Sequence, residues 1–259
     1  ALRSDLQTAP CRGLYKLNDN ASPWLVSLSS QKIDHDVPDP EQLARIKQEK
    51  QLLRQKQGDF PIGKEERSGN PAETQIITPV VGTNFSGNAY NGLSPLDNTL
   101  AVSNGGYVVT AANTSILYHD VNGNYLGGND FASFFNDTTL TGTIYDPRVI
   151  YDTGADRFIM SVLHGSSSTL SQILVCFSKS NNPLDGWWVY KLSGNVIGGC
   201  WFDYPSIGLS FNELFISGNA FYDYGGYNQP VVYQIRKAEG YAGNSLTYIW
   251  WGSIQTGNM

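Results

Sequence analysis

The chain has 259 residues, of which 15% are charged, and its formal net charge is −6. An acidic balance argues against a nucleic-acid partner, which needs a basic face, and no apolar run approaches the roughly 20 residues of a membrane-spanning helix. The 27 glycines and 15 tyrosines indicate a turn-rich sheet protein rather than a helical bundle.

Residues 1–75 differ in composition from the rest, and we expect them to form an N-terminal arm in which charge is concentrated. Asp39 can cap a helix, Pro40 suits its first position and Gln42 completes a capping box. This pattern predicts one helix over about residues 40–57, followed by a linker. The apolar stripe of the helix is thin. It is interpreted either as a solvated helix laid over the main domain or as a partner-binding or retention arm, and we prefer the solvated helix.

Residues 76–259 carry three copies of one four-strand unit, marked by Asp97, Asp146 and Asp203. The β-branched and aromatic residues of each copy suit a pleated, half-buried surface, and Asp, Asn and Gly supply the turns. The predicted strands are Leu100–Ser103, Tyr107–Ala111, Ser115–His119 and Tyr125–Leu126; Val149–Asp152, Arg157–Leu163, Ser171–Ser178 and Trp187–Leu192; and Ser206–Ser210, Leu214–Gly218, Val231–Ile235 and Leu246–Trp251.

Four-stranded antiparallel units that repeat at about 40 to 50 residues predict an all-β fold, a β-propeller of four-stranded blades. A sandwich would not explain why strand, turn, hairpin and aromatic strand recur in the same order. Known propellers have roughly four to eight blades, and three blades alone would leave a bare edge. We therefore expect the three blades to be part of a larger ring, with the remaining blades in another chain or a missing segment.

Four stretches of residues 84–251 share a family pattern: Pro95–Ser103, Asp146–Asp152 with Arg157-Phe158, Ser178–Pro183 with Trp187, and Asp203–Gly208. In these motifs the chain resembles exported bacterial β-propellers, common among surface and secreted proteins of Bacteroidetes-type bacteria that use the type IX secretion route. The resemblance implies an extracellular or cell-surface location and a binding or architectural role. The first residue is alanine rather than methionine, which also favours export after removal of a leader.

Asp97, Asp146 and Asp203 open the innermost strands and form the candidate metal site. A ring of carboxylates at the mouth of a channel can hold calcium through oxygen ligands. Alternatively, each aspartate accepts backbone N–H bonds from its own turn. We prefer this second interpretation, because a residue repeated in every unit is best explained by what every unit needs.

An enzymatic alternative is a sialidase-like or other glycoside-processing propeller. The stretch Asp152–Arg157 loosely resembles the Asp-rich hairpins of sialidase-type propellers, which use a tyrosine nucleophile and hold an anionic sugar with arginine. Arg148 and Tyr204 are of suitable type, but Arg148 can equally pair with Asp146 or Asp152. The sequence contains no serine–histidine–acid pattern, phosphate loop or metalloprotease motif. We therefore treat an enzyme as the weaker hypothesis.

Tyr222, Tyr224 and Tyr227 lie in the Gly-rich hairpin Ala220–Pro230 and are expected to face solvent. Exposed aromatic side chains anchor interfaces, so these tyrosines, together with Arg148 and Tyr204, are the candidate ligand-binding residues. The expected function is that of an exported, cell-surface propeller that acts as a binding or structural interaction module. Its expected partner is a surface protein or glycan.

Cys176 and Cys200 form the candidate disulfide, because both are expected on neighbouring blades of an exported protein. The alternative is three isolated thiols, with Cys176 as a core residue of its strand. The three cysteines have no CxxC spacing and the three histidines share no ligand spacing, so a zinc site is not expected.

Overall fold

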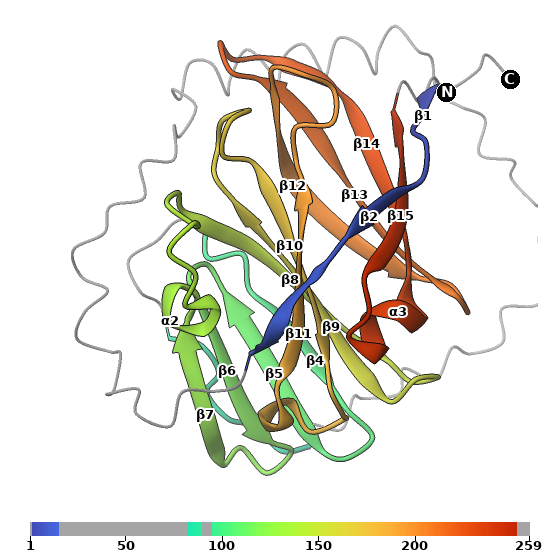
Figure 1. Cartoon of the computed structure of the whole chain (residues 1–259). Coiled ribbons are helices and arrows are strands. Elements are labelled where there is room, and N and C mark those ends of the chain that lie inside the picture. Colours follow the sequence, from blue (N-terminus) through green and yellow to red (C-terminus); the bar gives the residue numbers. More distant parts are fainter. Residues whose placement is uncertain (1, 16–81, 90–94, 253–259) are drawn as a thin grey trace, which may run out of the picture. The chain divides into compact units, whose positions relative to one another are not determined.

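The computed structural model describes residues 2–15, 82–89 and 95–252 (Figure 1). The chain divides into two compact units, residues 1–31 with 83–259 and residues 32–82. All described strands and helices belong to the first unit, which is all-β. Among the described residues, no helix has the length and apolar character needed to cross a bilayer. The predicted helix over residues 40–57 lies outside the described residues.

Three antiparallel sheets follow one another along the chain, and in each of them consecutive strands are neighbours. The first sheet contains β4 (Thr99–Val102), β5 (Tyr107–Ala112), β6 (Ser115–Asp120) and β7 (Tyr125–Asp130). The second contains β8 (Ile144–Asp152), β9 (Arg157–His164), β10 (Gln172–Ser178) and β11 (Trp187–Ser193). The third contains β12 (Cys200–Leu209), β13 (Glu213–Tyr222), β14 (Tyr227–Arg236) and β15 (Leu246–Gly252). The predicted strands and their grouping into four-stranded units are confirmed.

The first residues of the chain join the outer edges of two sheets. β1 (Leu2–Arg3) and β2 (Gln7–Ala9) pair with β15, and β3 (Cys11–Tyr15) pairs with β11. In Figure 1 this blue segment crosses from the third sheet to the second. We call residues 2–15 the N-terminal strap. They were assigned to the arm by sequence, but they belong to the sheet domain, because their backbone groups complete edge strands that are distant in the sequence.

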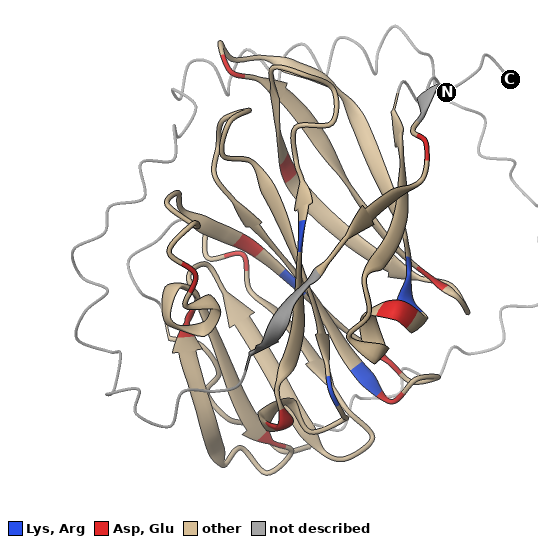
Figure 2. Ribbon diagram, in the orientation of Figure 1, with Lys and Arg blue, Asp and Glu red and all other residues tan. Residues whose placement is uncertain are grey.

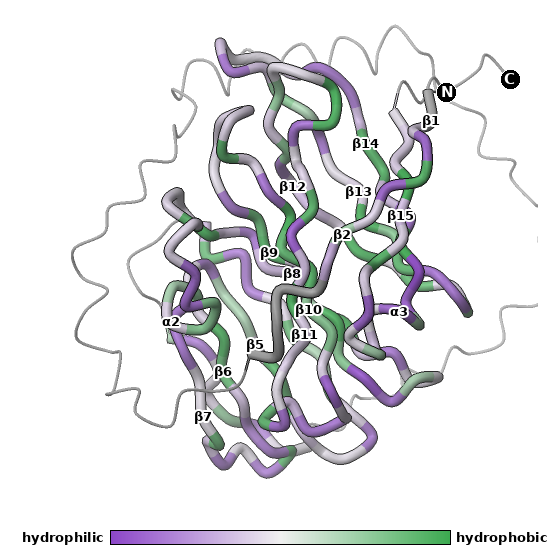
Figure 3. Tube along the Cα trace, viewed as in Figure 1, coloured by the Kyte–Doolittle hydropathy of each residue, from purple (hydrophilic) through white to green (hydrophobic). Residues whose placement is uncertain are grey.

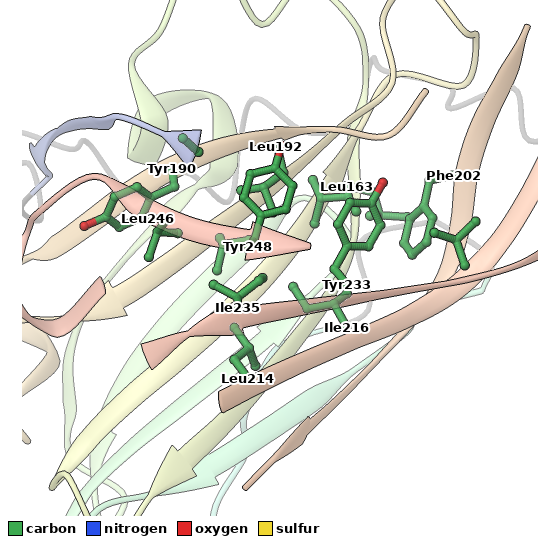
Figure 4. Close-up of a cluster of buried hydrophobic side chains, with 14 of the residues drawn as sticks. Leu163, Tyr190, Leu192, Phe202, Leu214, Ile216, Tyr233, Ile235, Leu246 and Tyr248 are labelled. Atoms are coloured by element: carbon green, nitrogen blue, oxygen red, sulfur yellow. The ribbon is translucent and has the colours of Figure 1, made fainter. Parts of the chain in front are cut away.

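Two hydrophobic layers hold the sheets together. The layer between the first and second sheets contains Val109, Ile116, Tyr118, Phe158, Met160 and Trp187, among others. The layer between the second and third sheets contains Ile159, Leu163, Val175, Leu214, Ile216 and Tyr233, among others (Figures 3 and 4). Neighbours in a strand, such as Phe158 and Ile159, enter opposite layers because side chains alternate across a sheet. The second sheet is thus buried on both faces.

The innermost strands are adjacent: β8 packs against β4 on one side and β12 on the other. Each inner strand has one associated residue in the left-handed conformation: Asp97 (φ 46°) just before β4, Asp146 (φ 49°) in β8 and Tyr204 (φ 56°) in β12. In β8 and β12 this residue lies in a bulge, where the pairing register shifts between Tyr145 and Arg148 and between Asp203 and Ser206. The third equivalent of Asp97 and Asp146 is therefore Tyr204. The predicted alignment on Asp203 was wrong by one residue.

In the described part of the chain, three short helices connect strands of the sheets. Helix α2 (Phe131–Phe135) begins after Asp130, whose carboxylate accepts a hydrogen bond of 2.7 Å from the Ser133 N–H, and it buries three phenylalanines. The 3₁₀ turn η3 (Pro183–Asp185) precedes β11, and α3 (Lys237–Ala242) precedes β15. Gly240 of α3 lies so close to the second sheet that an added Cβ would be 2.4 Å from the Phe177 ring. Helices of five or six residues carry too little periodic pattern for recognition from sequence.

Candidate functional site

Two of the predicted metal-site aspartates meet where β4 and β8 begin. The side chain of Asn113, which is fully buried, connects them. Its amide nitrogen donates hydrogen bonds of 3.0 Å to the Pro95 carbonyl and to the Asp97 carboxylate. Its amide oxygen accepts one of 2.8 Å from the backbone N–H of Asp146. Asn113 therefore ties the first sheet to the second and orients both left-handed residues.

The Asp146 carboxyl is only 8% exposed. Its burial, the negative charges of Asp203 and Asp97, and a side-chain hydrogen bond with Asp97 together raise the pKa of Asp146 to about 7, against a smaller opposing effect of Arg148. Asp97 and Asp203 thus both lie within electrostatic reach of Asp146. A carboxyl with this pKa holds its proton below neutral pH, so Asp146 is the protonated partner in its hydrogen bond with Asp97 there.

The candidate binding residues Arg148 and Tyr204 lie next to this cluster. The Arg148 guanidinium donates hydrogen bonds of 2.9 Å to the carbonyls of Pro205 and Pro147, so it links β8 to β12 through backbone groups. Tyr204 is 67% exposed. Burial of its hydroxyl and the charges of Asp203, Asp146 and Asp97 raise the pKa of Tyr204, which is opposite to the change that activates a tyrosine nucleophile.

The carboxylates are not arranged as a ready ligand set. Among the described residues, no group of three or more histidine, cysteine or acidic side chains has the geometry to hold a metal ion. Charged side chains are sparse on all three sheets (Figure 2). Asp97 and Asp146 are therefore joined through Asn113 and through a hydrogen bond between their own side chains, whereas Asp203 acts on Asp146 through its charge.

The three tyrosines of the predicted binding hairpin do not form one surface. Tyr222 and Tyr224 stack with their ring centroids 4.8 Å apart and an interplanar angle of 14°, and Tyr224 is 83% exposed. Tyr227 lies on the opposite face of the sheet, where Phe221 contacts both Tyr227 and Trp201. A bulge in β14 opposite Ala220–Phe221 and the alternation of β13 cause this separation. The structure keeps Tyr222 and Tyr224 together as a stacked pair in which Tyr222 is partly buried and Tyr224 is exposed.

The predicted Cys176–Cys200 disulfide is not formed, and both cysteines are free and buried. Cys176 lies in the layer between the first and second sheets, whereas Cys200 lies in the layer between the second and third. They lie on neighbouring sheets, but the second sheet stands between their side chains. Cys200 instead accepts a hydrogen bond of 3.2 Å from Asn228. The side chain of Cys11 lies outside the described residues.

One buried ion pair was missed by the sequence analysis. Lys237, in α3, donates hydrogen bonds of 2.6 Å to the Asp152 carboxylate and 2.7 Å to the Ser210 carbonyl, and Tyr241 donates to the same carboxylate at 2.6 Å. Burial alone would raise the pKa of Asp152, but the bonds from Lys237 and Tyr241 and the charge of Lys237 outweigh it and lower the pKa. No sequence signal distinguishes Lys237 from an exposed lysine.

A hollow of about 500 Å³ lies beside the N-terminal strap, away from the predicted site residues. Its lining combines polar side chains with two aromatic ones: Ser4, Asp5, Gln7, Ser193, Asn195, Val196, Tyr248 and Trp250. It is wide open to solvent, so it lacks the enclosure typical of small-molecule sites. The chain matches no protein-family model, no curated protein and no solved structure.

Proposed function

We propose that this protein is an exported, surface-associated interaction module built as part of a β-propeller. Three four-stranded units, each running from an inner to an outer strand in sequence order, support this architecture. The adjacency of β4, β8 and β12 agrees with blades arranged around an axis. In this proposal the remaining blades come from outside the described residues. The extracellular or cell-surface location rests on the family resemblance and on the composition of the chain.

The stacked pair Tyr222–Tyr224 is the observation that carries the binding role. Tyrosine combines a large rigid contact area with a hydroxyl, and it is enriched at the centres of interfaces. Tyr224 is exposed although it is aromatic, and its inner face rests on Tyr222, so the outer face is already oriented before a partner arrives. We propose that this pair contacts a surface glycan or a surface protein.

The test is binding of the full chain to an oligosaccharide array and to immobilised bacterial surface protein, compared with the variant Tyr224→Ala. Loss of one interface aromatic of this kind weakens binding by about tenfold or more. Tyr125→Ala is the matched control, because Tyr125 is 58% exposed but lies on the first sheet. Equal binding by the wild type and the Tyr224 variant, or binding lost equally in the control, would reject the proposed contact.

The glycoside-processing alternative has weaker support. It needs Arg148 to hold an anionic substrate, but the guanidinium already donates to two backbone carbonyls. It also needs an activated tyrosine, whereas the pKa of Tyr204 is raised. Turnover of a fluorogenic sialoside that disappears in Arg148→Ala and Tyr204→Phe would reverse this preference.

A further inference from the structure

The third sheet has one face that no described element covers. Side chains alternate along β13 to β15, and one set enters the layer shared with the second sheet. The other set mixes polar residues such as Ser217 and Gln234 with five apolar ones that are only partly buried and belong to neither hydrophobic layer. The apolar members are Phe215, Phe221, Val232, Ile249 and Trp251. We call these five residues the open face.

The opposite end of the three-sheet stack is covered. On the outer face of the first sheet, Val108, Thr110, Leu117 and His119 are all less than 9% exposed. Phe85 and Asn88 lie against this face: the Phe85 and His119 rings are 5.4 Å apart, and the Asn88 amide donates a hydrogen bond of 3.3 Å to the Ser115 hydroxyl. Within the described part of the chain, the first sheet is therefore capped and the outer face of the third sheet is not.

The strand pairings identify the residues that connect one sheet to the next. In the first sheet, Thr99 follows the left-handed residue Asp97 by two positions and pairs with Ala111 of β5. Asn113 follows Ala111 by two positions, and its backbone N–H bonds to the Leu96 carbonyl. The Asn113 oxygen accepts the Asp146 N–H at 2.8 Å, and the Thr99 hydroxyl accepts the Val149 N–H at 3.2 Å. Both acceptors thus hold the backbone of the inner strand of the following sheet, β8.

The third sheet repeats this pair of acceptors. Asn219 pairs with Asp203 and Ser206 with Ser217 across the β12 bulge, which makes Asn219 the equivalent of Asn113 and Ser206 the equivalent of Thr99. The second sheet differs, because Leu163 takes the asparagine position and Arg148 connects to β12 by donating to Pro205. Among the described residues, neither the Asn219 nor the Ser206 side chain has a hydrogen-bond partner.

We propose that the open face docks a partner that carries a four-stranded sheet of the same repeat, with an inner strand like β8. The Asn219 oxygen would accept a hydrogen bond from the backbone N–H of the partner's left-handed residue, as the Asn113 oxygen does from Asp146. The Ser206 hydroxyl would accept one from the backbone N–H three residues later, as the Thr99 hydroxyl does from Val149. The five apolar residues would then form a third hydrophobic layer. A second copy of this chain fits less well, because residues 82–89 already cover its first sheet.

The second sheet of this chain supplies the probe, since its face already fits an asparagine–hydroxyl pair of this kind. The full chain is extended after residue 259 by a copy of residues 143–193, which places the probe sheet at a high effective concentration. Hydrogen exchange and acrylamide quenching of tryptophan are compared between the extended and the unextended chain. We expect the appended strand amides to be protected at least 100-fold and the quenching of Trp251 to fall.

The variants Asn219→Ala and Ser206→Ala should each speed exchange in the appended strands several-fold, up to about tenfold, the effect of one buried hydrogen bond. Both should leave the melting of the unextended chain unchanged. Asn244→Ala, an exposed asparagine of the third sheet's last connection, is the matched control. The inference rests on the proposed propeller architecture but not on the Tyr224 contact, so failure of docking and failure of Tyr224-dependent binding are separate results.

The proposal would be overturned if the amides of the appended strands exchange without protection. It would also be overturned if their protection is the same in Asn219→Ala and Ser206→Ala as in the extended wild type. The unextended chain is also measured by light scattering after gel filtration, where we expect a monomer. A dimer that Val232→Lys dissociates would show that the open face serves self-association, and it would equally overturn the proposal.

Discussion

Replacing Asp146 by asparagine should change how the stability of this protein depends on pH. The carboxyl is 8% exposed and has a pKa of about 7, whereas an aspartate in an unfolded chain has a pKa of about 3.9. Asparagine has the same shape, can donate to Asp97 and tolerates the left-handed backbone at φ 49°. The variant therefore removes the titration and leaves the local geometry in place.

The sign and size follow from proton linkage. Below pH 4 Asp146 is protonated in both states, and folding has no electrostatic cost there. Between about pH 4 and 7 the unfolded chain releases the proton while the folded chain keeps it, so the wild type loses up to about 1.4 kcal/mol of stability per pH unit as the pH rises. Over three units this is at most about 4 kcal/mol.

The assay is urea unfolding of the wild type and Asp146→Asn at pH values from 4 to 8, followed by tryptophan fluorescence. The gain of the variant over the wild type should be near zero at pH 4, rise through pH 5 and 6, and level off above pH 7. Asp156→Asn is the matched control, because Asp156 also has a left-handed backbone (φ 56°) but lies in the β8–β9 turn. There its carboxylate accepts a hydrogen bond from the Asn181 amide. Its effect should not follow this profile.

A gain that is independent of pH, or a variant less stable than the wild type at pH 8, would refute the reasoning. The second result would mean that the native state needs the Asp146 carboxylate as an anion, as in a calcium site. Repeating the measurement with calcium chloride at pH 8 separates these cases. A bound cation would raise the melting temperature of the wild type and leave that of Asp146→Asn unchanged.

Three further predictions concern the parts of the fold that sequence alone did not identify. Lys237→Met should lower the free energy of unfolding, measured in urea, by about 3–5 kcal/mol, because it leaves the Asp152 side chain, which is 9% exposed, without its cation. The double variant Lys237→Met with Asp152→Leu should recover most of this loss. A double variant as unstable as the single one would contradict the prediction. Ala9→Asp should lower the thermal midpoint by several degrees, because Ala9 of the N-terminal strap is 2% exposed in the layer between the second and third sheets; an unchanged midpoint would show that the strap does not contribute. His164 is 1% exposed, and its ring accepts a hydrogen bond from the Gly142 N–H and contacts the Leu170 carbonyl, both at 2.9 Å. Burial lowers the pKa of His164, so the free energy of unfolding should fall as the pH drops below about 6.5, where the unfolded chain binds the extra proton. This fall should be shallower in His164→Gln, and an equal slope would assign the acid sensitivity to other groups.

The candidate site shows how far a repeat can be followed from sequence. Asp97 and Asp146 were matched correctly, because a polar residue before each inner strand is a local signal. The third match fell on Asp203 instead of Tyr204, because a bulge shifts the pairing by one residue and a tyrosine in the left-handed conformation is not expected. Asn113, which connects the two aspartates, carries no signal at all until the two sheets are placed together.

The sequence by itself determined the twelve strands and their order, because alternating apolar residues and the turn residues between them act over a few positions. Only the tertiary structure decided which layer each side chain enters. Cys176 and Cys200 are separated by the second sheet, and Tyr227 is separated from Tyr222 and Tyr224. It also decided that the N-terminal strap completes two distant edges. These features depend on contacts between segments far apart in the chain, and no local pattern encodes such contacts.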